Sequence, residues 1–411
     1  MKAEIVAVGD EILTGQTTDS NSAFIASELN TLGVDVTGIH VISDSAAAIT
    51  EALDDTVGRL DLVIITGGLG PTRDDITKKS LADYFGATMV TNSGVLENIR
   101  NLLAKRGVGL TANNRDQAKV PDNCKVLMNR MGTAPGMWFR ERGSIVISLP
   151  GVPYEMRHIV KEHVIPGLKP LLPSGGIFHR YVITYGLPEA QLAERLNPFC
   201  QTLPEELSIA YLPSYGTIRL RFTGRRGAEA LADEKIRELY RIIPDIIVGE
   251  GDLTIEKRVA ELLSERQMTL SVAESCTGGA ISSLLVSIPG CSNYFKGSVV
   301  AYSNSLKTDI LGVPESTIEI RGAVSEECVM VMAEGVKKVT GSDYSIATTG
   351  IAGPDGGTES KPAGTVWIAV STPKNTITEE HSFAWDREVN ITRSSIAALN
   401  LLRLELERDV E

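Results

Sequence analysis

The sequence predicts an α/β protein in which two three-layer α/β domains are joined by a small α+β domain. Three observations predict this class. Apolar, strand-like runs alternate with helix-like runs near both ends of the chain, as in parallel sheets covered by helices on both faces. Glycine-rich or polar loops follow several of those strands. The 411 residues also exceed what one hydrophobic core usually holds, which indicates two or three domains.

The first domain is predicted to span residues 1–167. Its opening strands are predicted at residues 4–8, 36–42 and 61–66, with helices at 21–32 and 46–58. Ligands of such sheets bind at the carboxyl ends of the strands, so the loops after these strands are candidate sites. Three later segments, residues 113–118, 129–136 and 149–156, are predicted loop-rich stretches of amides and small residues that suit the lining of a polar site.

A glycine-rich segment, Thr-Gly-Gly-Leu-Gly-Pro-Thr at residues 66–72, follows the third predicted strand. Glycines there allow close backbone approach to a phosphate, and threonines add hydroxyl donors. The candidate phosphate-binding residues are Thr66, Gly67, Gly68, Gly70 and Thr72. Asp74 and Asp75 follow directly, and their carboxylates suit a divalent cation beside that phosphate. Capping of the following helix is the other interpretation of these acids, and of Asp44.

Four motifs of this domain resemble the molybdopterin-binding-like domain of CinA-type competence/damage-inducible proteins. They are Gly-Asp-Glu at 9–11, the glycine-rich segment with its Asp pair at 66–75, Gly-Thr-Ala-Pro-Gly at 132–136 and Leu-Pro-Gly-Val-Pro at 149–153. The resemblance implies a metal-dependent ADP-ribose pyrophosphatase that yields AMP and ribose 5-phosphate. It implies that acids of this domain hold a divalent cation that activates water: Asp10, Asp44, Asp74, Asp75 and Glu155. A nucleotide or pterin binder without turnover is the alternative for this domain.

Residues 168–250 are predicted to form the small α+β domain. Prolines at positions 166, 170 and 173, followed by Ser-Gly-Gly, mark the boundary. Strands are predicted at 179–185, 217–223 and 246–248, and helices at 189–199 and 228–243. Arginines at positions 219, 221, 225 and 226 suit RNA or phosphate contacts, but alternating arginines on the exposed face of a half-buried strand also explain them. The family resemblance adds only a connecting role.

Residues 251–411 are predicted to form the second three-layer domain. Strands are predicted at 269–272, 298–303, 344–348, 365–370 and 381–385, and helices at 254–266, 280–288, 306–311, 325–340 and 389–407. Polar or glycine-rich loops follow three of these strands, around Ser275, Asn304 and Gly350. Because strand ends commonly converge in such folds, we expect these loops to share one pocket.

Two possible nucleophiles, Ser275 and Cys276, lie between a predicted strand and a predicted helix. A serine nucleophile needs a base, and His381, the one histidine of this region, falls inside a predicted strand. A buried lysine is the usual substitute because burial lowers its pKa. Lys307 is the candidate base and Lys361 its competitor. A thiol nucleophile would normally require a histidine partner, so the pattern favours serine with lysine.

Five motifs of this domain resemble the nicotinamide-nucleotide amidohydrolase domain of the same family. They are Glu-Ser-Cys-Thr-Gly-Gly at 274–279, Tyr-Ser-Asn-x-x-Lys at 302–307, Gly-Ala-Val-Ser at 322–325, Gly-Ile-Ala-Gly-Pro-Asp-Gly-Gly at 350–357 and Lys-Pro-x-Gly-Thr-Val-Trp at 361–367. The resemblance implies that nicotinamide mononucleotide is hydrolysed to nicotinate mononucleotide and ammonia without a cofactor. Ser275 would attack the carboxamide, and Lys307 would pass its proton to the leaving ammonia.

The resemblance also implies the residues that bind this substrate: Thr277, Gly278, Gly279, Tyr302, Asn304, Thr349, Gly350, Gly353 and Arg387. One segment departs from the family pattern. A Gly-Asp-Arg segment with a second arginine one helical turn later is expected to serve the phosphate. This chain has Trp385 in place of the glycine, and its next arginine is Arg393. Both arginines are alternatively surface residues at the start of the last helix.

Composition indicates the setting. A net charge of -12 and a pI near 5.1 argue against direct nucleic-acid binding and against an anionic-membrane surface. The start of the chain is unlike a signal peptide, and no run approaches the ~18 apolar residues of a membrane helix. Five scattered cysteines (Cys124, Cys200, Cys276, Cys291 and Cys328) form no metal-type pair, so a cytoplasmic protein with reduced thiols is expected.

The resulting hypothesis is a bifunctional hydrolase of the pyridine-nucleotide cycle. Its small-molecule partners would be nicotinamide mononucleotide and ADP-ribose, and the resemblance implies a homodimer. The alternative is a regulatory or binding protein of competence or DNA-damage responses in which one or both sites are inactive.

Overall fold

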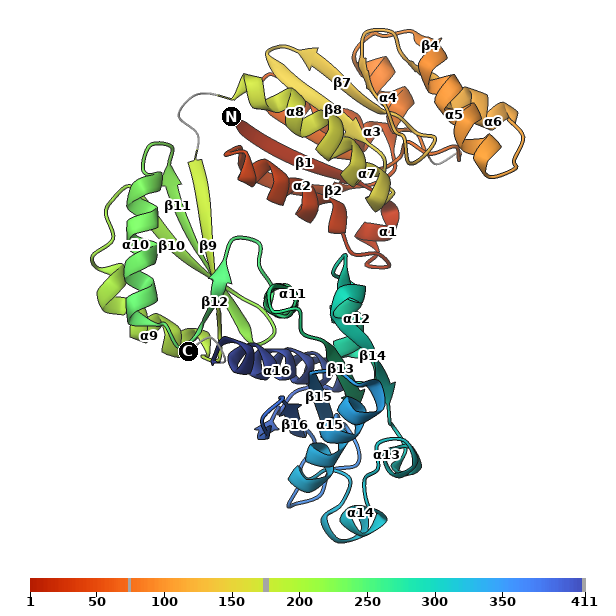
Figure 1. Cartoon of the computed structure of the whole chain (residues 1–411). Coiled ribbons are helices and arrows are strands. Elements are labelled where there is room, and N and C mark those ends of the chain that lie inside the picture. The colour runs from red at the N-terminus through yellow and green to blue at the C-terminus, as the bar shows by residue number, and fades with distance from the viewer. Residues whose placement is uncertain (73–74, 173–176, 409–411) are drawn as a thin grey trace. The chain divides into compact units, whose positions relative to one another are not determined.

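The computed structural model describes residues 1–72, 75–172 and 177–408 (Figure 1). It comprises two compact units. One contains Met1–His179 with Thr223–Ala230, and the other contains Arg180–Phe222 with Leu231–Glu411. In the described ranges, no helix combines the length and the apolar character needed to cross a membrane.

A six-stranded sheet forms the centre of the first unit. Its strand order is β2-β1-β3-β8-β7-β6. The β2–β1, β1–β3 and β3–β8 pairs are parallel, whereas the β8–β7 and β7–β6 pairs are antiparallel. The strands are β1 (Lys2–Val8), β2 (Asp35–Ile42), β3 (Leu62–Thr66), β6 (Lys125–Leu127), β7 (Gly136–Glu141) and β8 (Ser144–Leu149). The strands and helices predicted within the first 66 residues are present, with ends that differ by at most two residues.

Helices cover both faces of this sheet because its central strands are apolar on both sides. In β3, Leu62 and Ile64 enter one core cluster with α2 and α7, while Val63 and Ile65 enter another with α3 and α4. The helices are α1 (Asp10–Leu13), α2 (Ser20–Thr31), α3 (Ala46–Thr56), α4 (Thr77–Tyr84), α7 (Pro153–Ile159) and α8 (Ile165–Leu168), with short π and 3-10 turns at Val160–Val164 and Lys169–Leu171. The three-layer prediction is confirmed for this region.

A small subdomain follows α4. It pairs β4 (Met89–Thr91) with β5 (Lys119–Pro121) and adds α5 (Ser93–Lys105) and α6 (Ala112–Gln117). The prediction of a loop at residues 113–118 is wrong for most of this segment. Thr111 and Asn114 form a reciprocal capping box that starts α6 there.

The middle of the chain has the order β-α-β-β-α-β. Its elements are β9 (Ile177–Tyr185), α9 (Glu189–Cys200), β10 (Leu207–Pro213), β11 (Thr217–Arg225), α10 (Glu229–Ile242) and β12 (Ile247–Glu250). The sheet order β10-β11-β9-β12 is that of a ferredoxin-like fold. The α+β prediction is confirmed, although β10 was absent from it.

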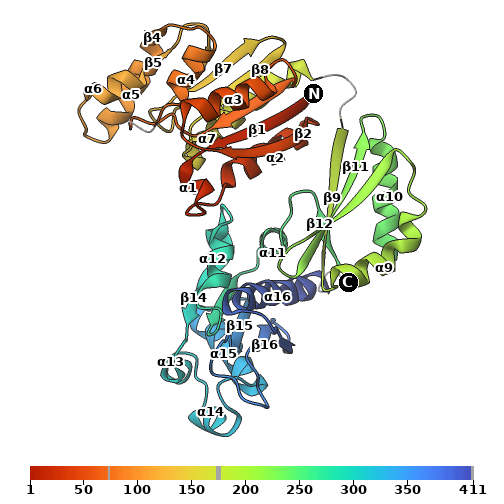
Figure 2. The same cartoon turned by 180° about the vertical axis from the view of Figure 1, so that it is seen from behind.

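A five-stranded sheet forms the centre of the C-terminal region, in the order β14-β13-β15-β16-β17. Figure 2 shows β14, β15 and β16 of this sheet from behind. The strands are β13 (Leu270–Glu274), β14 (Phe295–Val300), β15 (Tyr344–Gly350), β16 (Thr365–Ser371) and β17 (Thr376–Ser382). The helices are α11 (Ile255–Glu265), α12 (Ala280–Val286), α13 (Asn304–Asp309), α14 (Glu315–Arg321), α15 (Glu326–Thr340) and α16 (Arg387–Arg408), with a 3-10 turn at Cys291–Asn293.

This sheet is also covered on both faces. Leu270 and Val272 of β13 pack in the core cluster that holds α11 and α16, and Ala273 packs in the cluster that holds α15. The predicted strand at 381–385 is misplaced. The strand begins at Thr376 and ends at Ser382, where it pairs with β16.

Candidate functional sites

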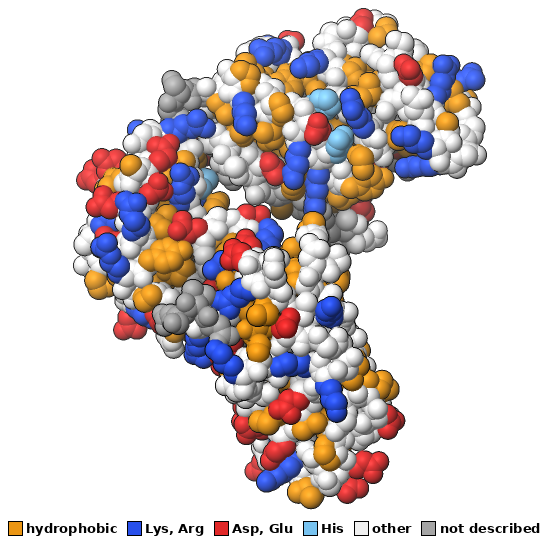
Figure 3. All heavy atoms as spheres, viewed as in Figure 1, with side chains coloured by type: hydrophobic (Ala, Val, Ile, Leu, Met, Phe, Trp, Pro, Cys, Tyr) orange, Lys and Arg blue, Asp and Glu red, His pale blue; other side chains and the backbone are white. Residues whose placement is uncertain are grey.

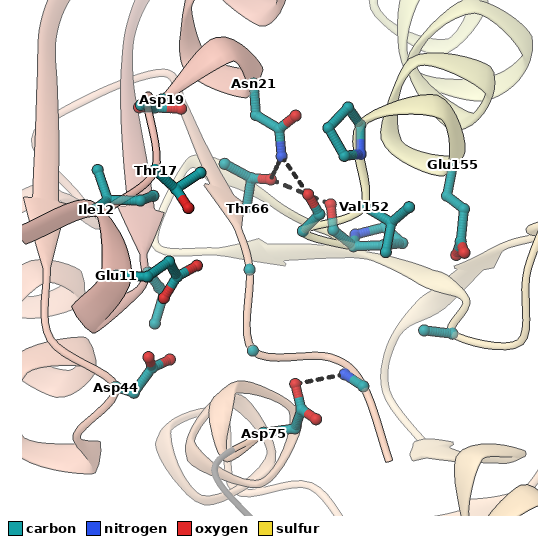
Figure 4. A pocket seen from close by; sticks show the side chains of 18 of the residues that line it. Glu11, Ile12, Thr17, Asp19, Asn21, Asp44, Thr66, Asp75, Val152 and Glu155 are labelled. Carbon is teal, nitrogen blue, oxygen red and sulfur yellow. Dashed lines mark hydrogen bonds between the residues drawn. The ribbon is translucent and has the colours of Figure 1, made fainter. Parts of the chain in front are cut away.

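A pocket of about 400 Å³ lies at the carboxyl ends of the parallel strands of the first sheet (Figure 4). Most of the predicted N-terminal site residues line it together: Asp44, Thr66, Gly67, Gly68, Gly70, Asp75 and Glu155. Thr72 lines an adjoining chamber, and Asp10 is not among the lining residues. Asp74 lies outside the described residues. The strand-end loops named from the sequence therefore do converge.

Two glycines and one acid determine the backbone conformation of the glycine-rich loop. Gly67 and Gly68 have φ values of +113° and +64°, and a Cβ on Gly67 would lie 2.2 Å from the carbonyl oxygen of Val8. Asp75 accepts hydrogen bonds from Gly70 N (2.7 Å), Thr72 N (2.8 Å) and Thr72 Oγ1 (2.5 Å). Both oxygens of Asp75 are thus engaged in shaping the loop, and the Thr72 hydroxyl donates to Asp75.

Asn21, in the first turn of α2, is a site residue that the sequence prediction missed. Its side-chain nitrogen donates to Thr66 Oγ1 (3.2 Å) and to the carbonyl oxygen of Gly151 (2.7 Å), as drawn in Figure 4. Its buried side-chain oxygen has no partner among the described residues. A pocket-lining amide with a vacant acceptor is ready to receive a ligand donor.

Asp10 and Asp44 form a second feature of this site. Asp10 N donates to Asp44 Oδ2 (3.1 Å), and Asp44 N donates to Asp10 Oδ1 (3.4 Å). Burial raises the pKa of Asp44, and the charges of Glu11, Asp10 and Asp75 raise it further against the opposing backbone hydrogen bond. A bound cation would relieve this repulsion between carboxylates.

The predicted ligand set is not assembled into one metal centre in the described part of the chain. No three His, Cys, Asp or Glu side chains described there are placed to hold one metal ion. Glu155 lies across the pocket from Asp44 in Figure 4 and accepts a 2.5 Å hydrogen bond from Asn129. Asp75 is engaged by its loop. Of the predicted ligands, Asp10 and Asp44 are the two that hydrogen bonds place next to each other.

In the C-terminal sheet, Glu274 is the last residue of β13, and its side chain lies at the N-terminal end of α12. Its fully buried carboxylate accepts from Gly279 N (2.9 Å), Ile281 N (3.2 Å) and Ser282 N (2.9 Å). The Gly279 N–H is therefore not free to bind a substrate oxygen. Ser275 N donates to Thr348 O and Gly278 N to Ser275 O. Among the described residues, the N–H groups of Cys276 and Thr277 donate to no oxygen atom.

The two possible nucleophiles differ in environment. Ser275 is buried and tied to the end of β15 through its N–H, 3.0 Å from Thr348 O. Cys276 packs into the core cluster with β13, and burial raises the pKa of its thiol to about 12. A thiol held neutral is a poor nucleophile, so the environment favours Ser275.

Lys307 is 2% exposed, and its Nζ donates to the carbonyl oxygens of Ala301 (2.9 Å) and Tyr302 (3.2 Å). Burial lowers its pKa, partly offset by Cys328 and Cys276. Glu274 pairs with Val300 in the sheet, so the loops that carry Ser275 and Ala301 leave adjacent strand ends. Lys307, bonded to Ala301 O and interacting electrostatically with Cys276, therefore lies near the turn that carries Ser275.

Lys361, the competing base, also bonds two backbone carbonyl groups but is less buried than Lys307. Its Nζ donates to the carbonyl oxygens of Arg321 (2.8 Å) and Val324 (2.6 Å). These bonds tie the glycine-rich loop before β16 to the segment after α14.

The expected substrate-binding residues fall into two groups. Arg387 donates to Gly353 O and to the Tyr302 hydroxyl, both at 2.9 Å, and so joins the loops after β14 and β15. Tyr302 and Asn304 are exposed. Two of the remaining members are buried threonines: the Thr277 hydroxyl bonds that of Thr348 (2.8 Å), and Thr349 donates to Ala323 O (2.8 Å). The others are glycines required by the backbone. Gly278 and Gly279 have positive φ, and a Cβ on Gly350 would lie 2.7 Å from Thr365 O.

The departure at Trp385 has a structural consequence. Trp385 is exposed, and the guanidinium of Arg393 lies 5.1 Å from the centre of its ring. The second arginine is therefore stacked on the residue that replaces the expected glycine.

A multidomain α/β protein with two separate candidate sites is the class that this fold and these residues define. The chain belongs to the CinA family. Residues 252–406 match the family described as "CinA C-terminal domain", residues 4–170 match "Probable molybdopterin binding domain", and residues 179–250 match "Damage-inducible protein CinA KH domain".

Relatives match over the full length. A CinA-like protein of Cytophaga hutchinsonii is 44% identical over 98% of both chains, and one of Flavobacterium psychrophilum is 44% identical over 99% of both. A crystal structure of a competence-damaged protein (CinA) superfamily member from Klebsiella pneumoniae is 34% identical, covers 38% of this chain and 96% of its own, and has a TM-score of 0.37.

Proposed function

We propose that the chain is a bifunctional hydrolase whose C-terminal domain deamidates nicotinamide mononucleotide and whose N-terminal domain cleaves ADP-ribose to AMP and ribose 5-phosphate. The observation that carries the first activity is the buried Lys307 beside the Ser275 turn. A lysine with a lowered pKa and no carboxylate partner at its Nζ among the described residues is suited to proton transfer.

In the deamidase reaction, Ser275 Oγ forms a bond to the carboxamide carbon while neutral Lys307 takes the hydroxyl proton. The oxygen that becomes negative is stabilised by the N–H groups of Cys276 and Thr277. Lys307 then gives the proton to the leaving nitrogen, the C–N bond breaks, and ammonia departs. Water hydrolyses the resulting ester with Lys307 as base, which releases nicotinate mononucleotide and restores Ser275.

The exposed cluster of Tyr302, Asn304 and Arg387 would hold the rest of the nucleotide. Arg387 donates one hydrogen bond to Gly353 O and one to the Tyr302 hydroxyl. A guanidinium has five N–H donors, so the others can bind a ligand. A guanidinium fixed in this way is suited to a phosphate group.

In the N-terminal site, Asp10 and Asp44 would hold a divalent cation together with substrate oxygens. Such a cation commonly uses one or two carboxylates, waters and substrate phosphates. When bound, it would neutralise the diphosphate and lower the pKa of a bound water. The glycine-rich loop lets the diphosphate approach the backbone, and Asn21 offers its vacant oxygen to a ligand donor.

Product analysis of the purified full-length chain tests the proposal. Nicotinamide mononucleotide is expected to release ammonia without added metal, and ADP-ribose is expected to yield AMP and ribose 5-phosphate only with a divalent cation. A chain that turns over neither substrate would instead support a binding or regulatory role.

A further inference from the structure

A smaller chamber of about 200 Å³ adjoins the N-terminal pocket. The two share four lining residues: Gly70, Pro71, Asp75 and Gln117. Asp75 holds the turn between them through three hydrogen bonds from Gly70 and Thr72. A molecule with two halves can therefore occupy both spaces with its middle at the glycine-rich loop.

Gln117, the last residue of α6, lies on the boundary between the two chambers. Its side chain is 3% exposed, and neither its amide nitrogen nor its amide oxygen has a hydrogen-bond partner among the described residues. Leaving a buried amide unpaired is energetically unfavourable, so such groups usually have a partner. In a residue that lines a cavity, the missing partner is most simply a ligand with both donor and acceptor groups, such as a sugar diol.

Lys78, in the first turn of α4, also lines the smaller chamber. Its Nζ donates to the backbone oxygen of Gln117 at 3.0 Å, which uses one of three N–H bonds. Burial lowers the pKa of Lys78 to about 8, although Cys124, Asp75 and Asp116 raise it in part. A bound anion would raise this pKa again by stabilising the ammonium.

The two chambers differ in what they can accept. The larger one has apolar walls from Val8, Ile12 and Val152, which suit the flat face of a nucleobase. The lining of the smaller one is dominated by polar and charged side chains: two lysines, two amides and two acids (Lys78, Lys79, Asn113, Gln117, Asp75 and Asp116).

We propose that this smaller chamber is a subsite for the ribose-phosphate half of the substrate, in which Gln117 binds sugar hydroxyls and Lys78 binds a phosphate oxygen. The AMP half then occupies the larger chamber. This inference rests on the proposed ADP-ribose activity. It adds the orientation of the substrate, a specific role for Gln117 within the predicted polar segment 113–118, and Lys78, which no sequence motif named.

The test measures binding, so that it does not depend on turnover. Ribose 5-phosphate and AMP are titrated separately against the full-length chain by saturation-transfer NMR, with thermal unfolding of the ligand-free protein recorded for each variant. The variants are Gln117→Leu and Lys78→Met, and Gln201→Leu, an exposed amide elsewhere in the chain, is the control.

Gln117→Leu and Lys78→Met are each expected to weaken ribose 5-phosphate binding about 10-fold and to leave AMP binding within about twofold. Gln117→Leu should also leave the ligand-free melting temperature unchanged or higher, because it removes an unpaired buried amide. Loss of AMP binding with ribose 5-phosphate unaffected would overturn the orientation. Wild-type binding of both compounds in both variants would overturn the subsite.

Failure of the proposed function gives a different result. A chain that binds ribose 5-phosphate through Gln117 and Lys78 but does not cleave ADP-ribose would retain the subsite and lose the pyrophosphatase assignment.

Discussion

The carboxylate of Glu274 accepts hydrogen bonds from the N–H and the hydroxyl of Ser282, at 2.9 and 2.6 Å. Its other oxygen accepts from Gly279 N and Ile281 N. All four partners are donors, which is the pattern of an ionised carboxylate, and the positive end of α12 compensates its charge. This arrangement fixes the turn that carries Ser275.

Replacing Glu274 by Gln tests that role. The new amide would direct its N–H groups at backbone donors, so we expect the local free energy of unfolding to fall by about 2–3 kcal/mol. Hydrogen exchange of peptides spanning residues 270–286, measured in increasing urea, reports this change. Exposed Glu265→Gln is the control, and equal protection in both variants would contradict the structural role.

Ser275→Ala is expected to lower ammonia release from nicotinamide mononucleotide by about 10⁴-fold or more, because the attacking oxygen is removed. Cys276→Ala should keep most of the activity, with a loss of about 1 kcal/mol in stability from the small cavity. Initial rates of ammonia formation for both variants check this. The reverse ranking would establish Cys276 as the nucleophile.

The pH dependence of the deamidase should follow Lys307. Burial lowers the pKa of Lys307, and the neutral form is the base, so kcat/KM should rise with pH through the lowered pKa and then level off. Lys307→Met should abolish this rise and reduce kcat by about 10²–10⁴-fold.

The same shift predicts a stability change of definite sign. Between the lowered folded pKa and the ordinary unfolded pKa, the unfolded chain binds more protons at Lys307, so stability rises with pH in that window. Lys307→Met should remove this contribution, which makes the variant more stable than wild type below the window. Urea unfolding of the C-terminal sheet at several pH values measures it, and identical pH profiles would argue against a shifted lysine.

The sequence predicts the sheet centres and the converging loops because burial on both faces leaves a clear pattern, as in residues 62–66. The sequence does not reveal which hydrogen-bond partners each polar side chain has. Asp75 reads equally well as a metal ligand or a cap until the turn brings Gly70 N and Thr72 N to its oxygens. Glu274 gives only a weak signal, an acid between an apolar strand and a turn of small residues.

The surface charges on one face of the molecule agree with the compositional argument against nucleic-acid binding. Acidic and basic side chains are interspersed on the face drawn in Figure 3. The arginines of β11 follow the alternation expected of a half-buried strand, with Ile218, Leu220 and Phe222 buried between them. Arg219 lies over the Tyr181 ring at 5.5 Å and forms an ion pair with Asp252.

Removal of divalent cations should abolish ADP-ribose cleavage and leave ammonia release intact, because the acids that fit a cation belong to the N-terminal pocket. Asp44→Asn should raise the metal concentration needed for half-maximal cleavage by about 10-fold or more, since one carboxylate ligand is lost. Metal titration of ADP-ribose cleavage provides the measurement, with exposed Asp35→Asn as control. Full cleavage in excess chelator would exclude the metal requirement.

Arg387 and Arg393 are expected to differ in their contribution to binding the phosphate of nicotinamide mononucleotide. Arg387 is fixed by Gly353 and Tyr302, so Arg387→Met should raise KM for the nucleotide about 10–100-fold. The same variant should have little effect on nicotinamide riboside, which lacks the phosphate. Arg393 is stacked on Trp385, and Arg393→Met should change KM by no more than about twofold. Steady-state kinetics with both substrates separates the two arginines, because a nucleotide-specific rise in KM in Arg393→Met alone would assign the phosphate to the stacked arginine.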